Sequence, residues 1–314
     1  MKILVTGGCG YKGSVLVPTL LEKGHEIISV DTQWFGNYLS SHPKLKNLKS
    51  DIRDLQPSIF QGVDVVIHLA NIANDPAVEL NPNLSWEVNV LGTQQLIEKS
   101  RKEGVKQFIF ASSGSVYGVK DEDRVTEDLD LVPISVYNKT KMIAERVLLS
   151  YKDDMAVHCI RPATVCGYSP RMRLDVSVNM FTYQALKNGK MTIFGGDQTR
   201  PNIHIKDMVN AYLQIIETAE HKINGQIFNV GFQNMPVLQI ANLVKNSFKS
   251  NINISVEETD DNRSYHISSK KIENQLNFKI KYTVDDAIKE IIESFEKNKF
   301  KNSLENENYF NIKN

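Results

Sequence analysis

Short apolar runs alternate along most of the chain with longer segments in which apolar residues recur at helical spacing. The runs predict strands buried on both faces, and the longer segments predict amphipathic helices. Strands are predicted at residues 3–5, 25–30, 45–49, 64–69, 106–111, 156–160, 191–194, 226–230 and 252–257, and helices at 11–23, 85–102, from about 133, from 179, and at 206–219, 238–249 and 284–297. This alternation indicates an α/β fold built on a parallel sheet.

The first predicted strand and helix are joined by a cluster of glycines. Gly8, Gly10 and Gly13 fit the spacing G-x-G-x-x-G, in which main-chain N–H groups can approach a pyrophosphate at the helix N-terminus. The spacing alone also fits a turn without a ligand. The context favours a ligand, because the second strand ends in Asp31, 18 residues beyond Gly13, where a dinucleotide site has an acid for the ribose 2′-hydroxyl. A carboxylate repels a 2′-phosphate, so NAD is predicted rather than NADP.

The helix predicted at 85–102 carries one apolar face and an asparagine, Asn89. The residues expected to face inward are Val88, Leu91, Leu96 and Ile97. Asn89 is expected to tie neighbouring loops to the sheet.

Composition narrows the partners. The chain has 314 residues, near the size at which one core splits into two lobes. Lys+Arg and Asp+Glu both number 37, so no basic excess favours nucleic acid. The N-terminus runs directly into a strand and no apolar segment approaches the ~18–20 residues of a membrane span, so we expect a cytoplasmic protein without a membrane partner. Cys9, Cys159 and Cys166 are odd in number and lack C-x-x-C spacing, which predicts reduced, mostly buried thiols and no metal site.

Candidate chemistry gathers at predicted strand ends. A Ser-rich turn containing Ser113 and Ser115 follows the strand at 106–111, and ligands of parallel sheets bind beyond such carboxyl ends. Tyr137 and Lys141 lie four residues apart, on one helix face, so the ammonium can reach beneath the phenol and lower its pKa from roughly 10 toward the range of a useful base. An ordinary surface pair is the alternative.

Two further strand ends carry weaker signals. Asp51 either accepts the adenine amino group, with Ile52 covering the ring, or caps a short helix. Ala70 and Asn71 follow a buried strand where the chain must pass close to a cofactor, whereas His68 is predicted to be a core histidine.

Arginines mark two predicted loops in the second half of the chain. Arg171 and Arg173 lie in the loop at 165–175, where strand ends converge. Arg200 follows two glycines in the loop at 195–204, where it suits a phosphate or is a solvated loop arginine. Residues 300–314 are rich in Asn, Lys and Glu, so we expect a loosely attached polar tail.

Taken in order, these landmarks resemble the extended short-chain dehydrogenase/reductases, specifically the NAD-dependent nucleotide-sugar epimerase/dehydratase family, over nearly the whole chain. The positions that match the family pattern are residues 6–13, Asp31, 51–52, 68–70, Ser113, Tyr137 with Lys141, 161–162 and 200–204. The resemblance implies a Rossmann-type, doubly wound parallel sheet with a smaller C-terminal α/β substrate lobe. The expected division gives residues 1–165, with a return segment at about 205–231, to the NAD-binding domain, and 166–204 with 232–299 to the substrate lobe.

The resemblance also implies roles for individual residues. Ser113, Tyr137 and Lys141 match the catalytic triad. The expected NAD contacts are Gly7, Gly10, Tyr11, Lys12, Gly13, Asp31, Asp51, Ile52, Leu69, Ala70, Asn71, Asn89, Ala111, Tyr137, Lys141 and Pro162. The expected contacts to a nucleotide-activated sugar are Ser113, Ser115, Arg171, Arg173, Asn179, Arg200 and Arg263.

Two departures from the family pattern bear on the activity. The family's 4,6-dehydratases follow the catalytic hydroxyl with Asp-Glu, but this chain has Gly114-Ser115, which disfavours dehydration. The segment at 165–175 resembles a subgroup associated with bacterial surface polysaccharides, including enzymes similar to nucleotide-heptose 4-dehydrogenases. The prediction is a nucleotide-sugar 4-epimerase that works through a transient 4-keto sugar; a 4-dehydrogenase or 4-ketoreductase with net redox, and a non-catalytic NAD-binding protein, remain as alternatives.

The resemblance further implies a homodimer. The helix that holds Tyr137 and the helix at 85–102 are expected to form a four-helix interface with the same pair of a second copy.

Overall fold

The computed structural model describes residues 1–120, 122–259, 264–300 and 306–312. Its strands are β1 (Lys2–Thr6), β2 (Glu26–Asp31), β3 (Leu45–Lys49), β4 (Val65–His68), β5 (Gln107–Ala111), β6 (Ala156–Pro162), β7 (Thr164–Cys166), β8 (Lys190–Phe194), β9 (Thr199–His204), β10 (Ile227–Val230), β11 (Gln233–Pro236) and β12 (Asn253–Glu257). Its α-helices are α1 (Gly13–Glu22), α2 (Asp75–Leu80), α3 (Pro82–Trp86), α4 (Thr93–Lys102), α5 (Val136–Leu149), α6 (Ser177–Asn188), α7 (Ile205–Glu217), α8 (Glu220–Ile223), α9 (Val237–Asn246), α10 (Lys270–Leu276) and α11 (Val284–Glu296).

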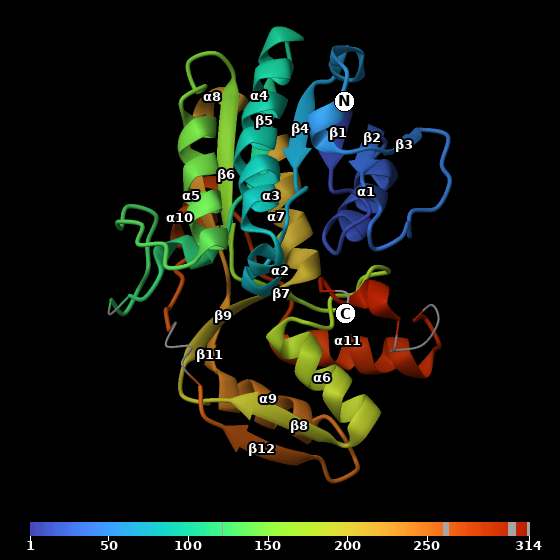
Figure 1. The fold of residues 1–314 in the computed structure, drawn as a ribbon, viewed down its shortest axis with the longest axis vertical. Helices are drawn as coiled ribbons and strands as arrows, with labels where there is room; N and C mark the ends of the chain where they lie inside the picture. Colours follow the sequence, from blue (N-terminus) through green and yellow to red (C-terminus); the bar gives the residue numbers. More distant parts are fainter. Residues whose placement is uncertain (121, 260–263, 301–305, 313–314) are drawn as a thin grey trace.

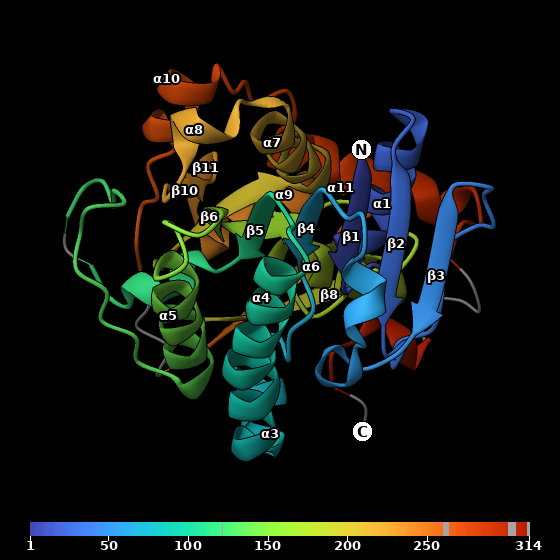
Figure 2. The same cartoon turned by 90° about the horizontal axis from the view of Figure 1, so that it is seen from above.

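Seven parallel strands form the central sheet, in the order β10-β6-β5-β4-β1-β2-β3. Helices cover both of its faces, with α1 and α7 on one side and α4 and α5 on the other (Figures 1 and 2). Strands such as β4 and β5 are buried along their whole length, because both faces lie under helices. The α/β fold with a doubly wound parallel sheet is therefore confirmed.

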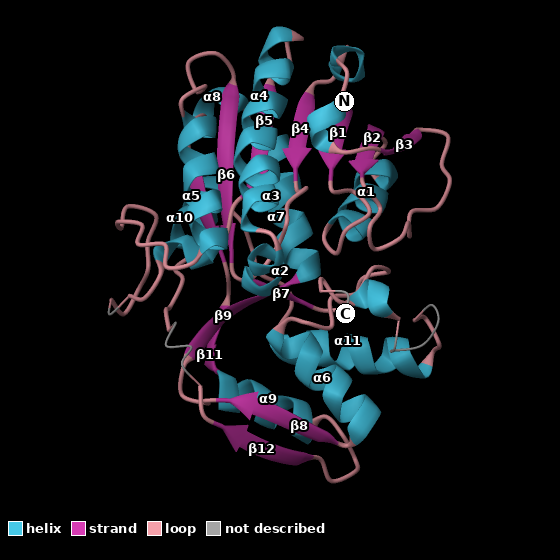
Figure 3. Cartoon of the chain, in the orientation of Figure 1, coloured by secondary structure: helices cyan, strands magenta, loops and turns pink. Residues whose placement is uncertain are grey.

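A smaller assembly of elements lies beyond the carboxyl ends of the central strands (Figures 1 and 3). It contains a three-stranded sheet in the order β11-β9-β7 and the parallel pair β12-β8. Its core is formed by apolar side chains of α6, α9 and α11, among them Phe181, Ile240 and Ile288. This assembly faces the edge of the central sheet where parallel strands place their ligands.

The predicted loop at 195–204 is wrong in its second half, which forms β9. That strand pairs in parallel with β7, which overlaps the start of the predicted loop at 165–175, and antiparallel with β11. The sequence of β9 is polar and contains Pro201, so it has no apolar run to reveal it. Pairing with two neighbours, rather than local pattern, determines this strand.

The helix predicted at 85–102 runs continuously from α3 through a π-helical segment, η3 (Glu87–Gly92), into α4. Val88, Leu96 and Ile97 are buried as predicted, but Leu91 is 55% exposed. A π-helical turn holds more residues than an α-helical turn, so the apolar repeat loses its phase there. The inward orientation predicted for Leu91 is therefore wrong.

The prediction of a loosely attached tail is wrong for residues 306–312. Tyr309 is only 1% exposed, and its backbone oxygen accepts a hydrogen bond of 2.8 Å from Leu174 N. Tyr309 also lies against Tyr38 and Phe300, with ring centroids 6.2 and 5.9 Å apart. Tyr309 and Phe310, the two aromatic residues of this otherwise polar segment, therefore anchor it.

Several smaller predictions can be compared directly with the structure. His68 is a core histidine as predicted: Nδ1 lies 2.6 Å from Thr6 Oγ1 and Nε2 lies 2.9 Å from Thr93 Oγ1, while burial lowers its pKa to about 3. All three cysteines are buried and unpaired. Within the described residues, no helix has both the length and the apolar content to cross a membrane.

A buried ion pair joins α5 to β6. Arg161 donates to Glu145 through Nε at 3.0 Å and Nη2 at 2.7 Å, and the two side chains are only 3% and 1% exposed. Arg161 Nη1 also donates to the hydroxyl of Tyr117, which donates to Asn229 on β10. Since Tyr137 and Lys141 lie on α5, this network fixes the helix that carries them.

Replacing Glu145 with Gln should therefore cost about 3–5 kcal/mol of unfolding free energy, because it leaves the Arg161 charge buried and unpaired. Denaturant unfolding would measure the loss. Glu98→Gln, which breaks an exposed pair with Arg101 of 2.9 Å on α4, is the control and should have a far smaller effect. Equal effects from the two variants would contradict the importance of the buried pair.

Candidate active site

A pocket of about 970 Å³ opens at the carboxyl ends of the central strands, between the sheet and the smaller assembly. Its walls include the glycine turn after β1, the ends of β2, β4, β5 and β6, and the loop before α6. The C-terminal segment at 306–312 contributes Glu307, Phe310, Asn311 and Ile312. This volume is at the upper end of those typical for small-molecule sites.

The glycine turn brings backbone against backbone. Gly7 has φ of +73°, and a β-carbon there would lie 2.6 Å from Ala70 N. A β-carbon on Gly13 would lie 2.3 Å from Gly7 O, so no side chain fits between the turn and the start of α1. At Gly10 the nearest atom to such a carbon is Gly7 O, at 3.3 Å.

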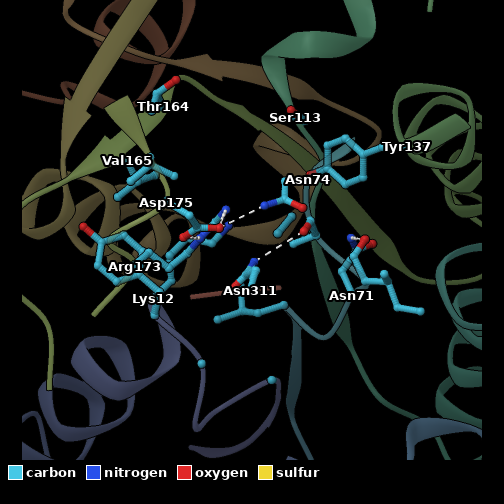
Figure 4. Close-up of a pocket in the computed structure, with 18 of the residues that line it drawn as sticks. Lys12, Asn71, Asn74, Ser113, Tyr137, Thr164, Val165, Arg173, Asp175 and Asn311 are labelled. Carbon is cyan, nitrogen blue, oxygen red and sulfur yellow. Dashed lines mark hydrogen bonds and ion pairs between the residues drawn. The ribbon is translucent and has the colours of Figure 1, made fainter. Parts of the chain in front are cut away.

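Cations crowd the pocket beside this turn. Burial and the neighbouring Arg173 lower the pKa of Lys12 to about 8, and burial together with Lys12 lowers the pKa of Lys141. Figure 4 shows Lys12 and Arg173 side by side. Mutual repulsion of this kind is relieved by an anion, so this cationic part of the pocket fits a ligand that carries phosphates, and Lys12 fits the pyrophosphate of a dinucleotide at the N-terminus of α1.

At the end of β2, the carboxylate of Asp31 is held in place. It accepts hydrogen bonds from Cys9 N at 3.0 Å and Gln33 N at 2.7 Å. Burial raises the pKa of Asp31, and these N–H groups oppose the rise. The other acid, Asp51, caps a short helix, as one of its two predicted roles requires, and pairs with Arg53 at 2.8 Å. Asp51 and Ile52 also line the pocket.

Ser113, Tyr137 and Lys141 reach the pocket from two elements. Ser113 follows β5, whereas Tyr137 and Lys141 come from the first two turns of α5. Lys141 Nζ donates to Ala111 O at 2.7 Å. Figure 4 shows the ring of Tyr137 beside Ser113, and Ser113 Oγ lies 2.8 Å from Ser115 Oγ, which donates to Asn138 Oδ1 at 2.6 Å.

The pKa of Tyr137 reflects opposing influences. Burial raises it, Arg173 lowers it, Asp75 raises it and the hydrogen bond with Ser113 lowers it, and together they leave the pKa at about 12. The cation that acts most on the phenol in this structure is thus Arg173. Lys141, which the sequence suggested for this part, lies 4.7 Å over the ring of Phe110.

The wall opposite Tyr137 is a polar network. Arg173 Nη2 pairs with Asp175 at 3.2 Å, and Asp175 accepts from Asn74 Nδ2 at 2.9 Å (Figure 4). Arg171 lies two residues earlier in the same loop, and its Nη2 donates to Asn311 Oδ1 at 2.7 Å. The loop before α6 thus contacts both the β4–α2 loop and the C-terminal segment.

The pocket brings together most of the residues predicted for the site. Those that line it are Gly7, Gly10, Tyr11, Lys12, Gly13, Asp31, Asp51, Ile52, Leu69, Ala70, Asn71, Ala111, Ser113, Ser115, Tyr137, Lys141, Pro162, Arg171, Arg173 and Arg200. Arg263 lies outside the described residues.

Two predicted residues do not reach the pocket wall. Asn89 is 1% exposed and bonds with both Ile72 N and Ile72 O, which is the loop-tying contact expected for it. Asn179 is fully buried in the first turn of α6. Its Oδ1 accepts a hydrogen bond from Gly167 N, and its Nδ2 donates to the Tyr11 hydroxyl and to Arg173 O. In this structure both amides position pocket loops and contact no open space.

Other pocket residues were not predicted. They include Trp34, Phe35, Asn74, Asp75, Asp175, Gln198, Tyr265 and the four residues of the C-terminal segment. The aromatic pair Tyr309-Phe310 in a polar tail was a usable signal for that segment. Asn74, whose φ is +78°, gave no signal because its conformation depends on the surrounding loops.

Comparisons with known proteins agree with this geometry. The model of the NAD dependent epimerase/dehydratase family matches residues 3–231. A putative UDP-glucose 4-epimerase of Methanocaldococcus jannaschii is 34% identical over 231 residues, covering 71% of this chain and 75% of the relative. The structure of UDP-glucose 4-epimerase from Thermotoga maritima with UDP-glucose has a TM-score of 0.84 at 28% identity, covering 95% of this chain and 99% of that one.

A second solved structure contains a dinucleotide. UDP-glucuronic acid 4-epimerase from Bacillus cereus, in complex with UDP-glucuronic acid and NAD, has a TM-score of 0.85 at 25% identity and covers 95% of this chain and 99% of its own. Since the family match spans well over half of the chain and the cationic glycine turn fits a dinucleotide, the chain belongs to the NAD-dependent epimerase/dehydratase family of extended short-chain dehydrogenase/reductases and is an enzyme that uses NAD.

Proposed function

We propose that this enzyme is a nucleotide-sugar 4-epimerase that acts through a transient 4-keto sugar. The observation that carries the proposal is the convergence of Ser113, Tyr137 and Lys141 in one pocket with the glycine turn. Relatives and solved structures named as UDP-glucose and UDP-glucuronic acid 4-epimerases support the substrate class. The predicted role in surface-polysaccharide sugar synthesis rests on the segment at 165–175.

In the proposed mechanism, Tyr137 moves the proton. When bound, NAD supplies the acceptor and donor of hydride. Tyr137 Oη takes the proton of the sugar's C4 hydroxyl and later returns it to the C4 oxygen, while Ser113 holds that oxygen by a hydrogen bond. The proposed holders of the cofactor are the glycine turn and Asp31, and Lys141 would donate a hydrogen bond to the nicotinamide ribose. The 4-keto sugar must turn over between the two hydride transfers.

The phenol has to lose its proton against the effect of burial. With a pKa of about 12, Tyr137 is protonated at neutral pH. Arg173 and Ser113 favour the phenolate, and a cationic nicotinamide ring would add to them. We therefore expect Tyr137 to act as a base when the cofactor is bound and ordered in the pocket.

The smaller assembly offers contacts for the nucleotide end of the substrate. Arg200 lies on β9 and lines the pocket, as do Gln198 and Phe194. We assign Arg200 to the substrate phosphates and Arg173, which acts on Tyr137, to the sugar.

Dehydration lacks the acid it would need at position 114. A β-carbon on Gly114 would lie 2.4 Å from Ile267 Cδ1 and 3.1 Å from Pro162 O. Ile267 thus fills the space into which an acidic side chain would project. Net redox, as a 4-dehydrogenase or 4-ketoreductase, uses the same residues and is separated from epimerisation only by the fate of the cofactor.

The test incubates protein purified with its own cofactor with UDP-glucose and UDP-glucuronic acid, and no cofactor is added. We expect the 4-epimer to form over many turnovers while the bound cofactor ends as NAD, because hydride is returned in each cycle. Chromatography of sugars and absorbance of the cofactor give both readouts. Reduced cofactor accumulating in proportion to a keto sugar would instead make the enzyme a net dehydrogenase.

Tyr137→Phe should lower kcat and kcat/KM together by about 10²–10⁴-fold, because the base acts mainly in the transition state. NAD content should stay the same. Lys141→Met should lose activity and cofactor together, since its ammonium is also assigned to the ribose. Single-turnover reduction of bound NAD by a nucleotide sugar measures the step, and in the parent enzyme its rate should rise with pH as the phenol ionises.

The matched control is Tyr151→Phe, which removes a phenol hydroxyl outside the pocket and should leave the rate unchanged. A Tyr137→Phe enzyme that reduces bound NAD at the parent rate would place the base elsewhere.

We also propose a homodimer through α4 and α5. These helices pack side by side on one face of the sheet (Figure 2), and the outer surface of the helix at 82–102 exposes Leu91 and Trp86, which are 55% and 36% exposed. A pair of such surfaces would bury both side chains in a four-helix contact.

Leu91→Glu should convert the dimer to a monomer at micromolar concentration, because it places a charge at the centre of the contact. Light scattering reports the mass. Leu238→Glu changes a leucine on α9 that is 37% exposed, and it should leave the dimer intact. A parent protein that is already monomeric would overturn the proposal.

A further inference from the structure

Arg171 carries an unsatisfied donor inside the pocket wall. Its side chain is 1% exposed, and Nε is buried without a hydrogen-bond partner among the described residues. Nη2 donates to Asn311 Oδ1 at 2.7 Å. A guanidinium donor buried in this way is costly unless a ligand atom accepts from it. Since Arg171 lines the pocket, the missing acceptor is to be sought there.

The surroundings of Arg171 put it on the side of the pocket that contains Asp31 and Phe35, which is the side proposed to hold the dinucleotide. Its guanidinium lies 4.2 Å over the ring of Phe35, in the loop that follows Asp31. The charged groups that face it are Arg173, Asp175, Asp31 and, if ionised, Tyr38; burial and Arg173 lower its pKa to about 10, so it is charged at neutral pH. The groups that act on Tyr137, by contrast, include Arg173 but not Arg171.

Asn311 holds Arg171 from the C-terminal segment. Asn311 Nδ2 also donates to Ala73 O at 3.3 Å, so one side chain links the loop before α6 with the β4–α2 loop (Figure 4). Behind it, Tyr309 O accepts from Leu174 N at 2.8 Å, and the ring of Phe310 meets that of Tyr183 edge-on, 5.6 Å away. Residues 306–312 therefore form a strap across one end of the pocket.

We propose that Arg171, positioned by Asn311, binds the pyrophosphate of NAD, and that the strap at 306–312 retains the dinucleotide between turnovers. The sequence suggested a substrate contact for Arg171, whereas its position beside Asp31 and Phe35 assigns it to the cofactor. A guanidinium forms paired hydrogen bonds with phosphate oxygens, which would satisfy Nε and offset the repulsion from Arg173. Retention also suits an enzyme that regenerates its cofactor in every cycle.

The test follows NADH release from the full-length protein, without any sugar present. Loaded protein is mixed with excess NAD, and the loss of bound-NADH fluorescence gives the release rate. Arg171→Met should release NADH faster by on the order of tenfold or more, because a charge-assisted pair is lost. Arg124→Met, which removes an exposed guanidinium outside the pocket, is the matched control and should release at the parent rate.

Asn311→Ala provides an independent variant, since it keeps the guanidinium but removes its support. Release should be faster than in the parent and slower than in Arg171→Met, and KM for the nucleotide sugar should stay within about twofold in both variants. Release at the parent rate from both variants would overturn the proposal, and so would an increase in KM alone, which would return Arg171 to the substrate. Because release needs no sugar, the result is independent of whether the enzyme is an epimerase.

Discussion

Backbone contact between the glycine turn and the end of β4 is the constraint on which the site depends. Neither Gly7 nor Gly13 has room for a β-carbon, so β1, α1 and the Ala70 backbone are held at their closest possible approach. The same turn bonds to β2 through Gly7 N and Val30 O at 2.7 Å, and through Cys9 N to the Asp31 carboxylate. One backbone segment therefore forms part of the pocket wall and positions both the Asp31 carboxylate and Lys12 at the start of α1.

The side chains proposed to be catalytic depend on a second arrangement, which is the placement of α5. Its first turn is capped by Ser135, which accepts from Asn138 N, and its interior is tied to β6 by Glu145 and Arg161. Between these two fixed points lie Tyr137 and Lys141. The hydroxyl chain from Ser113 through Ser115 to Asn138 then joins the end of β5 to the same helix. The proposed reacting groups, which come from separate elements, are thus held by short contacts.

Much of this could be predicted because the signals are local. Buried strands with apolar runs, the glycine spacing and the Tyr-Lys pair depend on a few neighbouring residues. The failures involve contacts that no local pattern reveals: β9 exists through its pairing with β7 and β11, and Leu91 is exposed because the helix changes phase at residues 87–92. Arg171 and Asn311 lie 140 residues apart in sequence, so only the folded chain could show that they meet at the pocket wall.

The three cysteines described above have a practical consequence for spectroscopy. Burial, together with nearby Asp31, raises the pKa of the Cys9 thiol to about 11, and burial raises those of Cys159 and Cys166 as well. Thiolates are the species that react with maleimides, so we expect the three buried native thiols to react with these reagents only slowly. Two cysteines introduced on the surface, one on each side of the pocket, can therefore carry fluorophores or spin labels without removal of the natural thiols, and the distance between the two labels becomes measurable during turnover.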